Sequence, residues 1–172
     1  LLEVPDLLIL DEPTNHLDID AIRWLEGTLK GWRGALLIVS HDRYFLDRAV
    51  NRIWEMTNIR IDEYKGNYST YLSQREERRK RTQEEWDAMM ERFMSEYKYI
   101  ERMTLDNPNA KGRFKRITRE VEAVQSHGID AVRYIKRKGW AQYTNNFERS
   151  NPPQTLAQLH KAIKGLKSPI QT

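Results

Sequence analysis

The chain has 172 residues, of which 39% are hydrophobic and 31% are charged, with a net charge of +4 and no cysteine. That apolar content excludes disorder throughout, and the lack of cysteine excludes disulfide partners and cysteine-bound zinc. The longest aliphatic run, from Ala35 to Val39, is far shorter than the ~20 residues of a membrane span. Glu3, Pro5 and Asp6 interrupt the apolar N-terminus, which therefore does not read as a signal peptide. We expect a cytoplasmic protein without a membrane partner.

The charge is unevenly distributed along the chain. Residues 1–67 contain 8 Lys and Arg against 12 Asp and Glu, a balance of −4, whereas residues 68–172 contain 21 against 13, a balance of +8. An acidic front and a basic back suggest two roles, the second of which involves a polyanion. The alternative is that long exposed helices simply carry many charges.

The first part of the chain alternates strand and helix patterns. The run Leu7 to Leu10 predicts a strand buried on both faces, and Ala35 to Val39 predicts a second one. Between them, Asp18 can cap a helix that continues to about Lys30. A strand, a crossover helix and a strand give a parallel pair, so both carboxyl ends lie at one edge of the sheet.

Shorter elements follow the second strand. A short helix is expected from about Asp42 to Arg48. Alternating residues over 52–56 and 59–64, on either side of Thr57-Asn58, predict a β-hairpin.

The period changes to that of helices from Tyr68. Apolar residues spaced four and three apart predict a long helix to Thr104 with a seam of the coiled-coil type, formed by Trp86, Met90, Phe93, Tyr97 and Ile100. A turn signal at 106–109 precedes a second seam formed by Phe114, Ile117, Val121 and Val124. Two narrow seams predict an antiparallel helical hairpin that extends away from the first domain as an arm.

The last part of the sequence, residues 127–172, is expected to be helical. Ile129 to Lys138 reads as a basic helix that ends at Gly139. Thr155 with Gln158 forms a possible capping box for a helix to about Gly165.

Candidate catalytic and ligand-binding residues follow the two predicted parallel strands. Asp11 and Glu12 come directly after the first strand, and Ser40 and His41 come directly after the second. In such sheets ligands bind at this edge, where one carboxylate can hold Mg²⁺ and the other can polarise an attacking water. A neighbouring imidazole can donate to a terminal phosphate. The alternative for each residue alone is a strand that ends in solvent or a histidine in a loop.

Two segments resemble the ATP-binding cassette ATPases. Leu7 to Asp18 is similar to their Walker B strand and D-loop, and Ser40 to Asp47 is similar to their histidine switch. The form of residues 15–18, with Tyr64 to Tyr68 afterwards, narrows the resemblance to the ABC-F group. These are soluble proteins with two tandem cassettes, many of which act on ribosomes. The predicted hairpin with Ala110 to Arg113 resembles the linker that joins the cassettes.

The resemblance implies roles for individual residues with ATP and Mg²⁺ as cofactors. Asp11 would be the magnesium-side carboxylate and would bind the metal through water. Glu12 would be the catalytic base, and His41 would contact the γ-phosphate. The remaining nucleotide-binding candidates are in the switch and the D-loop: Ser40, Asn15 and Asp18. For Asn15 and Asp18 the alternative is helix capping.

The resemblance also implies a domain division. Residues 1–67 would be the C-terminal part of a nucleotide-binding domain, 68–126 the basic helical-hairpin linker, and 127–172 its helical continuation towards a second cassette. Neither a phosphate-binding G-x-x-x-x-G-K-[ST] loop nor a Leu-Ser-Gly-Gly-Gln signature occurs in the sequence. The expected fold class is therefore a partial α/β cassette followed by an all-α antiparallel coiled-coil hairpin, and we expect no ATP hydrolysis by these residues alone.

The basic second part contains the candidates for RNA contact. Lysine and arginine side chains neutralise phosphates, so the binding they give is sensitive to salt and largely independent of base sequence. Two lie at the base of the arm and five begin the return helix near its tip: Arg78, Arg79, Lys111, Arg113, Lys115, Arg116 and Arg119. The alternative is a solvated coiled coil with Glu–Arg pairs supplied by Glu76, Glu77, Glu84 and Glu85.

Three functions are compatible with these features. The first is part of an ABC-F ATPase that acts on the ribosome, with its linker on tRNA and rRNA and a second cassette in the same protein. The second is a DNA-acting or structural nucleic-acid-binding protein of genome maintenance. The third, the ATPase subunit of a membrane transporter, is disfavoured by the basic arm. The sequence does not distinguish regulation of translation from rescue or from protection against antibiotics.

Overall fold

The computed structural model describes residues 5–56, 61–103, 106–147 and 150–169. The chain is mostly helical, with two small sheets, and divides into two compact units, residues 1–78 and 79–172. No helix in these described ranges combines the length and the apolar character that a membrane crossing requires.

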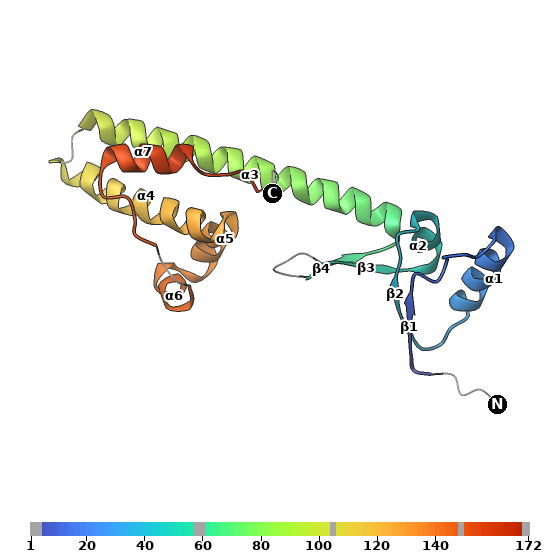
Figure 1. The fold of residues 1–172 in the computed structure, drawn as a ribbon. Coiled ribbons are helices and arrows are strands. Elements are labelled where there is room, and N and C mark those ends of the chain that lie inside the picture. Colours follow the sequence, from blue (N-terminus) through green and yellow to red (C-terminus); the bar gives the residue numbers. More distant parts are fainter. Residues whose placement is uncertain (1–4, 57–60, 104–105, 148–149, 170–172) are drawn as a thin grey trace. The chain divides into compact units, whose positions relative to one another are not determined.

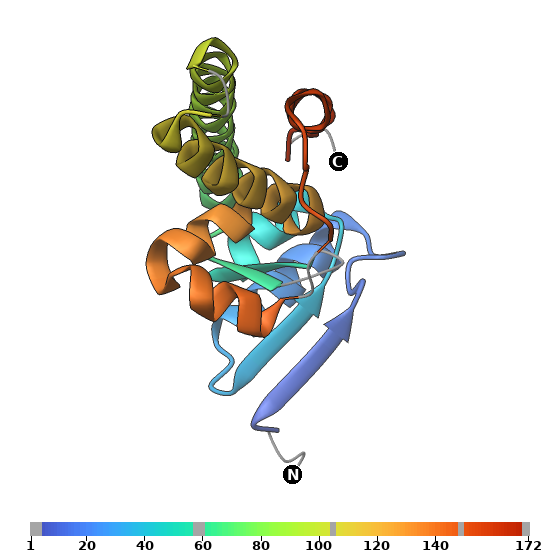
Figure 2. The ribbon, with the colours of Figure 1, turned by 90° about the vertical axis from the view of Figure 1, so that its left-hand side faces the viewer.

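The first unit begins with a parallel pair of strands joined by a helix. Its elements are β1 (Leu7–Asp11), α1 (Ile19–Lys30) and β2 (Ala35–Val39). Leu7 pairs with Ala35 at one end of the ladder and Asp11 with Val39 at the other. Figure 2 shows the two strands side by side and pointing in the same direction. The parallel arrangement predicted from the strand–helix–strand pattern is present.

One face of this parallel pair is exposed. Leu7, Ile9 and Val39 are 52%, 61% and 55% exposed, and they alternate with half-buried residues along both strands. The prediction that these strands are buried on both faces is wrong for this chain, because within its described residues no element covers the second face. Continuous apolar runs of this kind are typical of strands with a layer on each side.

Two helices of the first unit each begin next to an aspartate whose carboxylate accepts hydrogen bonds from backbone N–H groups of the first turn. Asp18 accepts from the backbone N–H of Ala21 at 2.8 Å at the start of α1. Asp42 accepts from Tyr44 and Phe45 at the start of α2 (Arg43–Ala49). Such caps satisfy amides that have no partner within the helix.

An antiparallel hairpin follows, formed by β3 (Arg52–Met56) and β4 (Ile61–Lys65). The predicted turn at Thr57-Asn58 lies outside the described residues. Tyr64 is buried, and the ring of Tyr71, in the helix that follows, meets its edge at 4.9 Å between centroids. The hairpin therefore packs against the start of that helix, α3 (Tyr68–Met103).

The second unit is built on a helical hairpin. The later part of α3 is followed by α4 (Pro108–His127), which runs back in the opposite direction (Figure 1). Arg113 and Arg116 of α4 both contact Glu96 of α3, at 3.1 Å, and Arg92 pairs with Glu120. These pairs join residues 17 to 28 positions apart, as an antiparallel arrangement requires.

The hairpin core is wider than the two predicted seams. Trp86, Phe93, Tyr97 and Ile100 are buried as predicted, but Met89 is buried where the spacing indicated Met90. The buried face of α4 also extends beyond its predicted seam to Ala110, Thr118, Glu122 and Ala123. A stripe of this width needs further helices against it.

Helices from the last part of the chain supply that cover. They are α5 (Ile129–Lys138), α6 (Trp140–Asn146) and α7 (Leu156–Lys164). Ile129, Val132, Leu159 and Ile163 join the hairpin residues in one hydrophobic cluster. The hairpin is therefore not formed by two narrow seams alone, because residues of α5 and α7 pack against it.

Candidate nucleotide-facing and nucleic-acid-facing sites

The parallel strands bring Glu12 and His41 into contact. Nδ1 of His41 lies 2.8 Å from Oε2 of Glu12, and the backbone N–H of His41 donates to the same oxygen at 3.4 Å. The backbone N–H of Glu12 in turn donates to the carbonyl of Val39 at 2.7 Å. The two residues are 29 positions apart in the chain, so their contact is a product of the parallel register at the carboxyl edge of the sheet.

Glu12 has an unusual backbone conformation. Its φ is +45°, and that of His16 in the following loop is +64°. Residues other than glycine rarely adopt this left-handed region, and such conformations gather at functional sites. At Glu12 the conformation ends the strand and lets the carboxylate meet the chain that leaves β2.

The contact shifts both acid–base equilibria. The hydrogen bond from His41 lowers the pKa of Glu12, and the hydrogen bond to Glu12 raises the pKa of His41. The carboxylate stays ionised at neutral pH, as a group that accepts a proton must be. The imidazole is exposed over 77% of its surface and the carboxylate over 28%, so both can be reached from solvent.

The other predicted nucleotide residues each make contacts of their own. The Oγ of Ser40 accepts from the backbone N–H of Asp42 at 3.1 Å, which shapes the loop that carries His41. Asp18 caps α1, so its capping alternative is present in the structure. The backbone N–H of Asn15 donates to the carbonyl of Glu12 at 3.1 Å. The assignment of these residues to nucleotide binding stays a prediction.

Among the residues at this edge of the sheet, one carboxylate, that of Asp11, fits a magnesium site. The described residues contain no group of three or more His, Cys, Asp or Glu side chains that could hold a metal ion. Asp11 is exposed at the end of β1. Mg²⁺ is commonly held by one or two carboxylates together with substrate phosphates and water. Asp11 therefore fits the protein's share of such a site, and the remaining ligands would come from the nucleotide and from water.

Several predicted RNA-contact residues are held by other side chains. Arg78 pairs with Asp62 at 3.0 Å and lies 4.4 Å from the ring centroid of Tyr64. Arg113 and Arg116 share Glu96, and the guanidinium of Arg119 lies 5.8 Å from the centroid of a ring of Trp140. Arg78, Arg113 and Arg116 are therefore paired within the chain, but their partners are Asp62 and Glu96 and not the glutamates that the sequence suggested.

Other cations in the same region remain accessible. The side chains of Arg79, Lys111 and Lys115 are exposed and make no ion pair within the described part of the chain. Lys98 and Arg102, which the sequence reading missed, have the same character on the last turns of α3. Their spacing of four residues, outside the apolar seam, is the signal that identifies them.

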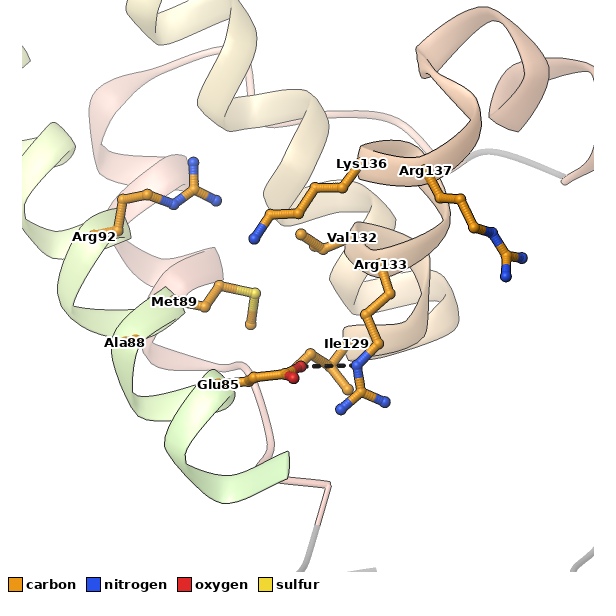
Figure 3. Close-up of a pocket in the computed structure, with 9 residues that line it drawn as sticks. All are labelled: Glu85, Ala88, Met89, Arg92, Ile129, Val132, Arg133, Lys136 and Arg137. Carbon is orange, nitrogen blue, oxygen red and sulfur yellow. Dashed lines mark hydrogen bonds and ion pairs between the residues drawn. The ribbon is translucent and has the colours of Figure 1, made fainter. Parts of the chain in front are cut away.

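A pocket of about 610 Å³ lies elsewhere, between α3 and α5. Figure 3 shows the ion pair between Glu85 and Arg133, and Lys136 of α5 extending towards the side of Arg92. Met89 and Val132 in its lining are only 6% and 7% exposed, because both belong to the hydrophobic cluster of the hairpin. It is a seam between packed helices, in which Arg133 joins α5 to α3.

Comparisons with known proteins match both parts of the chain. A family model described as ABC transporter matches residues 54–131. The chain is 63% identical over 75 residues to the ATP-binding protein YdiF of Bacillus subtilis, and 55% identical over 78 residues to the energy-dependent translational throttle protein EttA of Mycobacterium tuberculosis. It is 38% identical over 141 residues to the ribosome protection protein VmlR of Bacillus subtilis.

These matches cover different shares of the proteins. They include 44%, 45% and 80% of this chain, but only 12%, 14% and 26% of YdiF, EttA and VmlR. The chain thus spans about a quarter or less of the length of these relatives. Over the matched residues the chain is therefore similar to ABC-F proteins, which is consistent with its being part of such a protein.

Proposed function

We propose that the chain is part of an ATP hydrolase that couples ATP binding and hydrolysis to action on the ribosome. The observation that carries this is the contact between Glu12 and His41, 2.8 Å apart at neighbouring ends of parallel strands. The names of EttA, a translational throttle protein, and VmlR, a ribosome protection protein, support the ribosome as partner.

In this proposal each residue at the strand ends has a separate task. Glu12, kept ionised by His41, orients and polarises the attacking water. His41 donates towards the terminal phosphate once its contact with Glu12 is exchanged for one with the nucleotide. Asp11 would hold Mg²⁺, which neutralises charge on the phosphates when bound. The loop through Ser40 and Asp42 positions the imidazole.

The proposed division is a partial cassette over residues 1–67, a linker over 68–126, and a helical continuation over 127–172. The exposed apolar face of β1 and β2 supports a partial cassette, since the rest of such a domain would cover it. The sequence contains no phosphate-binding loop, so we expect no turnover by these 172 residues alone. Measurable hydrolysis by this chain that Glu12→Gln abolishes would contradict that expectation.

The proposed RNA surface is the cationic end of the hairpin. Lys111 and Lys115, with Lys98 and Arg102 on the other helix, present charges without ion-pair partners in the described residues. Such cations bind phosphates by releasing counterions, without a need for a base sequence. In the proposal they contact tRNA or rRNA while the cassettes close on ATP in the cytoplasm.

The test uses the complete protein of which we propose this chain to be a part. Glu12→Gln keeps the shape of the side chain but removes the base, so ATP should trap the protein on ribosomes in a co-sedimentation assay. Wild type, which hydrolyses ATP, should be released. Preferential retention on branched or single-stranded DNA, with no ribosome complex, would replace this function by a DNA-acting one.

A further inference from the structure

The first turns of α3 are held by carboxylates from three neighbouring elements of the first unit. The backbone N–H of Ser69 donates to Oδ1 of Asp47, on α2, at 2.7 Å. Arg75 pairs with Glu55 of β3 at 2.8 Å, and Arg78 pairs with Asp62 of β4 at 3.0 Å. The base of α3 is therefore fixed to α2 and to the hairpin instead of pivoting freely after β4.

The contact from α2 has a special position in the chain. Asp42, directly after His41, caps the first turn of α2, and Asp47 lies towards the other end of the same helix. A seven-residue helix is about 10 Å long and its backbone hydrogen bonds make it a stiff unit. Phe45, 1% exposed, anchors it between the two ends. A shift of the His41 loop therefore reaches Asp47 through one short element.

The hydrogen bond to Ser69 is a strong contact of its kind. A carboxylate that accepts a backbone N–H makes a charge-assisted bond, and this one lowers the pKa of Asp47. The first turn of α3 already has a local cap, because Asn67 accepts from the backbone N–H of Thr70 at 3.0 Å. Asp47 thus adds a contact from outside the helix to a turn that its own sequence caps.

We propose that Asp47 is a positioning residue that couples the loop of His41 to the first turn of α3. When His41 exchanges Glu12 for a phosphate, α2 follows the loop and Asp47 changes its hold on Ser69. The role of this coupling in moving the linker rests on the proposed function, whereas the coupling itself is a property of the chain.

The coupling can be measured in this chain without nucleotide or ribosome. Glu12→Ala frees the His41 loop, and amide hydrogen exchange then reports on Ser69. In the otherwise unchanged chain, Glu12→Ala should raise the exchange rate of the Ser69 amide about fivefold, which is the effect of losing one hydrogen bond. In a chain that already carries Asp47→Ala, adding Glu12→Ala should leave that rate unchanged. Asp20→Ala, an exposed acid in the first turn of α1, is the matched control and should leave Ser69 unchanged. Equal effects of Glu12→Ala in both backgrounds, or none in either, would overturn the proposal.

The consequence for function is tested in the complete protein. Asp47→Ala should lower ATP-dependent retention on ribosomes at least fivefold. Asp47→Asn retains an acceptor oxygen and should restore part of the retention, which a purely structural role through charge would not. If Glu12→Gln traps ribosomes but Asp47→Ala binds like wild type, the coupling is refuted and the proposed function stands. If Glu12→Gln traps none, the proposed function fails while the exchange result keeps its meaning.

Discussion

At the scale of single residues, the Glu12–His41 contact makes a prediction about acid–base behaviour. The hydrogen bond raises the pKa of His41 above its ordinary value of about 6.5 and lowers that of Glu12. Glu12→Gln removes the negative partner, so the pKa of His41 should fall back towards its ordinary value. Titration of the imidazole proton signals by NMR measures this directly.

The same shifts define the pH range in which the pair stabilises the fold. A raised His41 pKa gives a contribution that is present below the ordinary value and lost as pH rises through the folded value. A lowered Glu12 pKa gives a contribution that is lost as pH falls through its folded value. Urea unfolding of wild type and Glu12→Gln should therefore differ most in mildly acidic solution. A difference that grows at alkaline pH would contradict the pairing.

At the scale of elements, the attachment of α7 to the hairpin is testable. Leu159 is fully buried in the cluster that also contains Phe93 and Val121. Leu159→Ala should lower the free energy of unfolding by about 2–5 kcal/mol, because it removes buried methyl groups and leaves a cavity. Lys161→Ala, an exposed position on the same helix, should cost less than ~0.5 kcal/mol. Equal urea midpoints for the two variants would show that α7 does not pack there.

Elements with strong local signals follow closely from the sequence. The cap at Asp18, the apolar run 35–39 and the long heptad-like spacing predict α1, β2 and α3 to within about one residue of their observed ends. The position of Glu12 and His41 at the same edge of the sheet also follows, because the order strand, helix, strand makes the two strands parallel. Their direct contact depends on the observed register and was not predicted. Whether the two residues catalyse hydrolysis is a separate matter that the geometry leaves as a prediction.

Features that depend on distant partners could not be predicted in the same way. The pattern around Leu159 indicates an apolar helix face but not that this face packs on the hairpin. Likewise, Arg113 and Arg116 look like free cations until the antiparallel register places Glu96 beside both. The exposed side of β1 and β2 was missed because an apolar run does not report which layers are present around it.

At the scale of the whole molecule, the distribution of paired and unpaired cations decides how RNA binding should be tested. Neutralising Arg113 and Arg116 would leave Glu96 without its partners, and any loss of binding would then mix altered packing with lost phosphate contacts. Lys111 and Lys115 avoid this problem, since their side chains are exposed and pair with no acid in the residues described.

Under the proposed function, neutralising these two lysines should therefore weaken ribosome binding through charge alone. In the complete protein, Lys111→Gln with Lys115→Gln should reduce the slope of log affinity against log salt by about two, one for each lost phosphate contact. Lys161→Gln with Lys164→Gln removes the same charge from exposed positions on α7 and should leave the slope unchanged. Basal ATP hydrolysis should be unaffected in both. An equal drop for both pairs would mean that only net charge matters, and no drop for either would remove the hairpin end from the RNA surface.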